Sequence, residues 1–134
     1  MPASPAPPPA PKPRLPLGRW LMALSIGLWL VIIVLSLLPG EERPHTGFSG
    51  NVEHFVAYAG TAGITALGFA GPAVSAIVLG FSAASGLFEI AQLFIPGRTS
   101  GLDNWFASTL GALAGALAAR RVAAPLLALW FARR

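Results

Sequence analysis

The chain has 134 residues, of which 54% are hydrophobic and 10% are charged, and its mean hydropathy is +0.67. Soluble domains carry about a quarter of charged residues, so this composition excludes an ordinary soluble domain and predicts a single domain whose main solvent is lipid. The sequence contains no cysteine, which excludes disulfides, thiolate metal sites and a cysteine nucleophile.

The net charge of +4 comes from basic residues that flank the apolar runs. Seven of the nine lie before the first run or after the last: Lys12, Arg14, Arg19, Arg120, Arg121, Arg133 and Arg134. This distribution is typical of the positive-inside rule and argues against a nucleic-acid partner. We therefore expect a multi-pass protein of the bacterial inner membrane with both termini in the cytoplasm.

The chain opens with a Pro- and Ala-rich stretch, residues 1–18, which is expected to be a disordered tail. Four apolar segments follow, at residues 20–38, 54–70, 74–94 and 103–119. About 20 helical residues cross a hydrocarbon core of roughly 30 Å. The expected fold is all-α, with four transmembrane helices bundled within residues 19–121. Residues 122–134 are expected at the cytoplasmic interface or as an extension of the fourth helix.

Three of the expected helices each carry one stripe of polar or small residues. The stripes are His54, Tyr58, Thr61, Thr65 and Gly68, then Ser82, Ser85, Glu89 and Gln92, then Asn104, Ser108, Gly111 and Gly115. Steps of three and four place each set on one face of its helix, so we expect the stripes to face one another. The GxxxG spacing of Gly111 and Gly115 predicts helix packing rather than chemistry.

Glu89 is the ionisable residue expected deepest in the membrane, about 9 Å below the outer end of its helix. A carboxyl group at that depth has to be neutral or paired, and the candidate partners are His54, Tyr58 and Arg98. Two interpretations stay open: a functional site, and an ion pair with Arg98 that pins the helices.

The remaining polar residues favour an anion site over a metal site. Arg98 suits bidentate binding of a phosphate or a carboxylate. Only His54, Glu89 and Asp103 are candidate metal ligands, so we expect neither a metal nor another cofactor. The residues between the first two apolar segments are expected to be solvated loop charges: Glu41, Glu42, Arg43 and His45.

Three strings carry a family resemblance. They are Asn51-Val52-Glu53-His54-Phe55-Val56-Ala57-Tyr58, Glu89-x-x-Gln92-x-Phe94-x-Pro96-Gly97-Arg98-x-Ser100, and Asp103 through Gly111-Ala112-Leu113-Ala114-Gly115. With these strings, residues 36–117 resemble the VanZ-like family of small polytopic membrane proteins. The chain departs from the family pattern in having Gly50 and Asn51 where an Asp-Lys pair is frequent. Asn104 stands where the family tends to have an acid, and Asp103 lies one residue early.

The resemblance implies a role in the cell envelope, because the founding member of the family is associated with teicoplanin resistance. We expect a non-enzymatic accessory factor whose outward-facing pocket binds a membrane lipid or a lipid-linked precursor and lowers sensitivity to teicoplanin and other lipoglycopeptides. The expected pocket residues are His54, Tyr58, Glu89, Gln92, Arg98, Ser100, Asp103 and Asn104.

Two other functions remain open. One is a membrane-embedded enzyme acting on a lipid-linked precursor, with His54 and Glu89 as a general acid/base pair and Arg98 stabilising negative charge. No recognisable nucleophile motif accompanies them. The other is proton or ion transport through Glu89, which with so few spans would require a homo-oligomer packed through Gly111 and Gly115.

Overall fold

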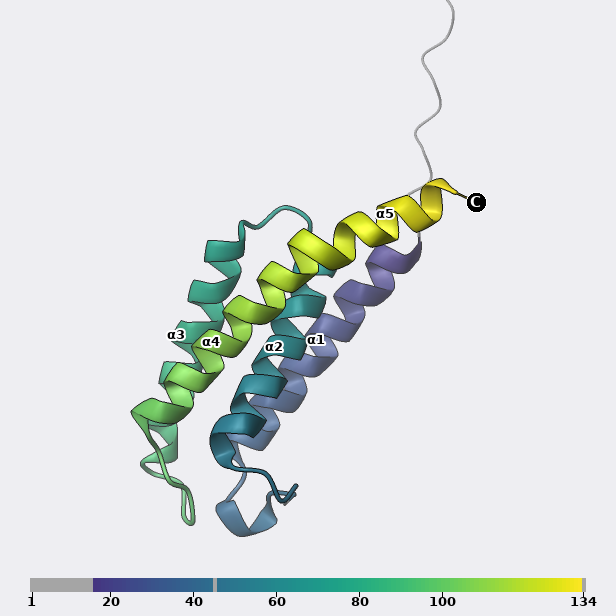
Figure 1. Ribbon diagram of the computed structural model, residues 1–134. Helices are drawn as coiled ribbons and strands as arrows, with labels where there is room; N and C mark the ends of the chain where they lie inside the picture. Colours follow the sequence, from purple (N-terminus) through teal and green to yellow (C-terminus); the bar gives the residue numbers. More distant parts are fainter. Residues whose placement is uncertain (1–15, 45, 134) are drawn as a thin grey trace, which may run out of the picture.

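The computed structural model describes residues 16–44 and 46–133, and its elements are helices joined by short loops (Figure 1). Residues 1–15 of the expected disordered tail and His45 lie outside the described residues, whereas residues 16–18 already belong to the first helix. The helices are α1 (Pro16–Leu37), α2 (Gly50–Gly68), α3 (Val74–Gln92), α4 (Leu102–Ala118) and α5 (Ala124–Ala132). A short 3₁₀ turn, η1 (Gly40–Glu42), follows α1, and a π-helical turn, η2 (Ala119–Ala123), joins α4 to α5.

Three helices in the described part of the chain are long and apolar enough to cross a membrane. They span Leu17–Leu37, Val74–Gln92 and Leu102–Ala132, the last of which runs from α4 through η2 into α5. The all-α expectation is confirmed, but the expectation of four spanning helices is wrong. α2 forms over 19 residues but falls short in apolarity, because it holds Glu53 and His54 near its start and threonines and glycines further along.

α2 packs most extensively against α4 and next against α1. Small residues allow these close approaches. A Cβ atom at Gly115 would overlap the carbonyl oxygen of Ala59, and one at Gly111 would overlap that of Phe55. Gly68 lies in the same way against the backbone of α1. Helices that approach to this distance gain van der Waals contact along their backbones, which is a main source of association in a lipid solvent.

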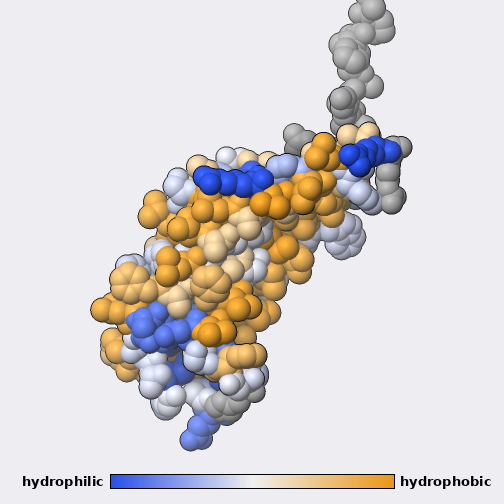
Figure 2. Space-filling view, in the orientation of Figure 1, coloured by the Kyte–Doolittle hydropathy of each residue, from blue (hydrophilic) through white to orange (hydrophobic). Residues whose placement is uncertain are grey.

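Hydroxyl groups link the helices inside the bundle. Ser25 of α1 hydrogen-bonds Thr65 of α2 over 2.7 Å, and Ser82 of α3 hydrogen-bonds Thr109 of α4 over 2.8 Å. Large apolar side chains instead cover the outside, and Figure 2 shows them across the middle of the visible face, with hydrophilic residues gathered towards its two ends. Polar groups inside and apolar side chains outside suit a bundle that is surrounded by lipid.

Arg120 holds the connection between α2 and α3. Its guanidinium group donates to the carbonyl oxygens of Phe69, Ala70 and Pro72 at 2.7, 3.1 and 3.0 Å. We expect Arg120→Gln to lower the free energy of unfolding by about 2 kcal/mol. A hydrogen bond to a charged group contributes about 1.5–3 kcal/mol, and the total for Arg120 is reduced because two of its three hydrogen bonds are exposed to solvent. Thermal unfolding in detergent measures the effect, and Arg121→Gln is the matched control because Arg121 is exposed. Equal melting temperatures for the two variants would contradict this assignment.

Candidate functional site

The loops that join α1 to α2 and α3 to α4 meet at one end of the bundle. The Gly40 N–H donates to the carbonyl oxygen of Pro96 over 3.1 Å, and a Cβ atom at Gly40 would overlap the Gly97 carbonyl group. Gly97 has a φ angle of +72°, a left-handed conformation that favours glycine. The Pro-Gly-Arg string therefore brings its loop against the end of α1 and places Arg98 there.

Arg98 and Gln92 both bind the end of α1. Arg98 Nη2 donates to the carbonyl oxygens of Leu35 and Ser36 at 2.8 and 3.0 Å. Gln92 Nε2 also donates to the carbonyl oxygen of Ser36, over 3.0 Å. The last carbonyl groups of a helix have no partner within the helix, so these bonds satisfy groups that would otherwise be orphaned. The two residues fix the position of α1 against the loop between α3 and α4.

Glu89 and Arg98 form no ion pair with each other among the described residues, so the structure does not have the helix-pinning pair. Glu89 is 7% exposed, and its Oε2 accepts the N–H of Gly101 over 2.8 Å at the start of α4. Its other oxygen, Oε1, is buried without a hydrogen-bond partner, as is Nε of Arg98. Both side chains therefore keep hydrogen-bonding capacity that the described residues do not use.

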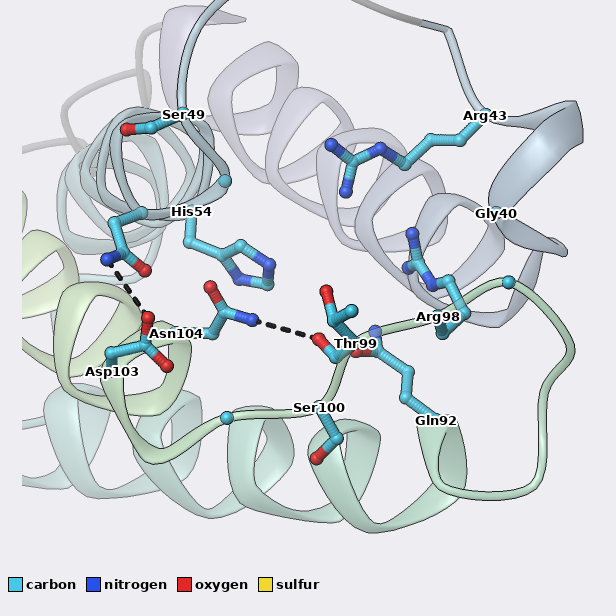
Figure 3. Close-up of a pocket in the computed structure, with 14 residues that line it drawn as sticks. Gly40, Arg43, Ser49, His54, Gln92, Arg98, Thr99, Ser100, Asp103 and Asn104 are labelled. Carbon is cyan, nitrogen blue, oxygen red and sulfur yellow. Dashed lines mark hydrogen bonds between the residues drawn. The ribbon is translucent and has the colours of Figure 1, made fainter.

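A polar pocket of about 480 Å³ lies where these loops meet (Figure 3). Six of the eight expected pocket residues line it: His54, Gln92, Arg98, Ser100, Asp103 and Asn104. Glu89 lies just behind this lining at Gly101, and Tyr58 lines a second cavity. The loops also bring in residues that the sequence analysis did not assign to the pocket, among them Gly40, Ser49, Asn51 and Thr99.

Arg43 lies in the pocket and not, as predicted from the sequence, among the solvated loop charges. Its guanidinium group lies beside that of Arg98 in the pocket and pairs with Glu53, which also accepts the hydroxyl of Thr46 (Figure 3). The expectation of a solvated loop charge is therefore wrong for Arg43, although Glu41 and Glu42 are exposed. Partial burial lowers the pKa of Arg98, and the charge of Arg43 lowers it further. Two guanidinium groups that repel each other in one pocket favour an anion between them.

His54 reaches the pocket from the first turns of α2. Its Nδ1 lies 3.1 Å from the hydroxyl oxygen of Ser108, which leaves Nε2 as the ring nitrogen available to a ligand. The imidazole stacks on Tyr58 with 6.3 Å between ring centroids, and the Tyr58 hydroxyl lies beside Ser85 and Ser108. The carboxyl group of Glu89 is close enough to interact electrostatically with His54. The polar stripes of α2, α3 and α4 thus meet directly below the pocket.

The start of α4 forms the opposite wall. Asn51 Nδ2 donates to Asp103 Oδ2 over 3.1 Å, and Asn104 Nδ2 donates to the carbonyl oxygen of Thr99 over 3.4 Å (Figure 3). Asp103 therefore ties α4 to α2 at the rim, one residue before the position that the family pattern gives to an acid. In the part of the chain that the structure describes, no three His, Asp or Glu side chains converge as a metal site.

A second cavity, of about 490 Å³, lies beside the polar pocket and has a mostly apolar surface. Residues of α1 and α2 form most of its wall, including Ile32, Leu35 and Val56. Three polar residues line both cavities: Arg43, His54 and Arg98. A charged chamber and an apolar chamber therefore adjoin at these side chains.

One comparison with known proteins gives a match. A protein-family model described as VanZ/LLP1 matches residues 16–127, which include every helix from α1 to α4. No curated protein and no solved structure matches the chain significantly.

Proposed function

The chain belongs to the VanZ/LLP1 family, and from this premise we propose that it is a non-enzymatic envelope protein of the bacterial inner membrane that binds an anionic lipid headgroup or lipid-linked precursor. The observation that carries the proposal is the convergence of Arg43 and Arg98 on one pocket. Each guanidinium group has five N–H donors in a planar fork, which matches the oxygens of a phosphate or a carboxylate. Only some of these donors are used within the protein.

The charge distribution supports an outward-facing pocket. All five acidic residues lie on the loops and helix ends at the pocket side, whereas Arg19, Arg120 and Arg121 lie towards the opposite end. Figure 1 places the start of α1 and the end of α5 at that same opposite end. By the positive-inside rule, this end faces the cytoplasm, so the start of α1 and the end of α5 lie on the cytoplasmic side and the pocket opens on the outer side. α2 is less apolar than the three spanning helices, but it carries the chain from the pocket end back to the cytoplasmic end, where α3 begins (Figure 1).

Binding at the outer face connects the pocket to the property of the founding family member. Lipoglycopeptides act on lipid-linked material outside the inner membrane. A protein that binds an anionic envelope ligand there would alter the material that is available to the antibiotic. We include lower teicoplanin sensitivity in the proposal on this ground. The Nε2 of His54, which lines the pocket, would supply a further hydrogen bond to the ligand.

Titration of the purified full chain in a neutral detergent tests the proposal. The probes are dioctanoyl phosphatidylglycerol and farnesyl monophosphate, both anionic, with dioctanoyl phosphatidylcholine as the zwitterionic comparison. We expect the anionic probes to bind more tightly, and Arg43→Gln to weaken them at least tenfold, or about 1.4 kcal/mol.

Arg121→Gln is the matched control, because it removes the same charge at the other end of the bundle. It should leave the affinity unchanged. Equal affinity for anionic and zwitterionic probes, or an equal loss in both variants, would refute the proposed pocket.

A further inference from the structure

The apolar cavity beside the polar pocket has a definite depth along the helices. It reaches from Val52 to Tyr58 on α2, six residues or about 9 Å, and to Ile32 on α1. Its volume of about 490 Å³ lies within the range of roughly 300–1,000 Å³ that is usual for small-molecule sites. The cavity thus begins at the level of the loops and extends into the apolar part of the bundle.

The cavity opens on the outside of the bundle. Its exposed lining residues include Leu35, Val52 and Val56, with exposed fractions of 37%, 46% and 61%. These side chains belong to the apolar surface that a surrounding bilayer would cover. A hydrocarbon chain can therefore enter sideways from the membrane between α1 and α2 without crossing a polar layer.

The order of the two chambers matches a lipid at its normal depth in a bilayer. The charged groups lie at the loops, and the apolar wall begins directly below them. We propose that an anionic glycerophospholipid of the surrounding membrane binds here, with its phosphate at Arg43 and Arg98 and one acyl chain in the apolar cavity. The inference rests on the proposed function and deepens it by naming the ligand class.

The residues at the junction favour a glycerophospholipid over an isoprenoid phosphate. A glycerophospholipid carries ester carbonyl groups between its phosphate and its chains, whereas an isoprenoid phosphate has no hydrogen-bond acceptor there. His54 lines both chambers, and in the tautomer whose Nδ1 accepts from the Ser108 hydroxyl, its Nε2–H is a donor at that junction. The site thus offers the polar pocket, the His54 donor and the apolar cavity in the same order as the phosphate, the ester group and the acyl chain of the lipid.

Filling the apolar cavity tests the inference separately from the phosphate pocket. Ala57 lines only the apolar cavity, and Ala57→Phe places a ring in it. Ala83→Phe on α3 is the matched control, because Ala83 is also an exposed helical alanine and lines neither chamber. We expect Ala57→Phe to weaken dioctanoyl phosphatidylglycerol at least tenfold and Ala83→Phe to leave its affinity unchanged. The deacylated headgroup, glycerophosphoglycerol, should bind both variants and the wild type equally weakly.

Each alternative outcome has a distinct meaning. If Ala57→Phe binds phosphatidylglycerol with wild-type affinity, the acyl-chain site in the apolar cavity is overturned. If Arg43→Gln still loses affinity in that case, the proposed function stands. Tighter binding of farnesyl monophosphate than of phosphatidylglycerol would overturn the choice of a glycerophospholipid. If thermal unfolding shows that Ala57→Phe is not folded, Val52→Trp fills the same cavity from another exposed position on α2 and carries the same expectation.

Discussion

Gly115→Val is expected to destabilise the bundle by about 3 kcal/mol or more, because a side chain there meets backbone and not another side chain. Any Cβ atom at Gly115 would overlap the carbonyl oxygen of Ala59, and Gly63 lies on the same contact. Overpacking usually costs about 1–3 kcal/mol when neighbouring side chains can rotate away, and a helix backbone cannot. α2 and α4 would have to separate along their most extensive contact. Thermal unfolding in detergent should show the variant melting far below the wild type.

Gly60→Val on α2 is the control for this variant. Gly60 is exposed and has nothing within 4 Å of a Cβ position, so the added side chain finds open space. We expect a change within about 0.5 kcal/mol, as for other surface substitutions. A Gly115→Val protein that melts with the wild type would mean that α2 and α4 are further apart than the structure places them.

The helices could be predicted because their polar and apolar residues recur every three or four positions in the sequence. α3 occupies Val74–Gln92 where the apolar run predicted residues 74–94, and the steps of three and four on α2, α3 and α4 predicted faces that the structure brings together through contacts such as His54 with Ser108. The start of α2 was missed by four residues. Its first turn, Gly50-Asn51-Val52-Glu53, holds a single large apolar residue, and hydropathy does not reveal a helix start of that composition.

The pocket was only partly predictable, for a different reason. Arg98 and Gln92 stand out because they belong to a specific string, but Arg43 comes from a loop with no pattern of its own. What places Arg43 is the contact between Gly40 and Pro96–Gly97, a backbone-to-backbone approach between loops far apart in the sequence. Such a contact involves no side-chain periodicity, so only the folded chain shows it. The same holds for the apolar cavity, whose walls come from two different helices.

Arg98→Ala is expected to lower stability and to abolish ligand binding together. The substitution removes two hydrogen bonds from a charged group to the end of α1, each of which contributes about 1.5–3 kcal/mol, and it leaves the Leu35 carbonyl without this donor. Because Arg98 is partly exposed, we expect a total loss of about 2–3 kcal/mol. The same substitution deletes one of the two guanidinium groups of the polar pocket. Thermal unfolding and phosphatidylglycerol titration of one preparation measure both effects.

Glu89→Gln separates the structural contribution from the functional one. The amide oxygen of glutamine can still accept the N–H of Gly101, so stability should stay within about 1 kcal/mol of the wild type, while the negative charge behind the pocket disappears. A negative charge beside an anion site weakens binding of the anion, so Glu89→Gln should remain folded and bind phosphatidylglycerol at least as tightly as the wild type. A Glu89→Gln protein that melts as low as Arg98→Ala would instead make Glu89 a residue that holds the start of α4, because its carboxylate would then matter to folding more than to the ligand.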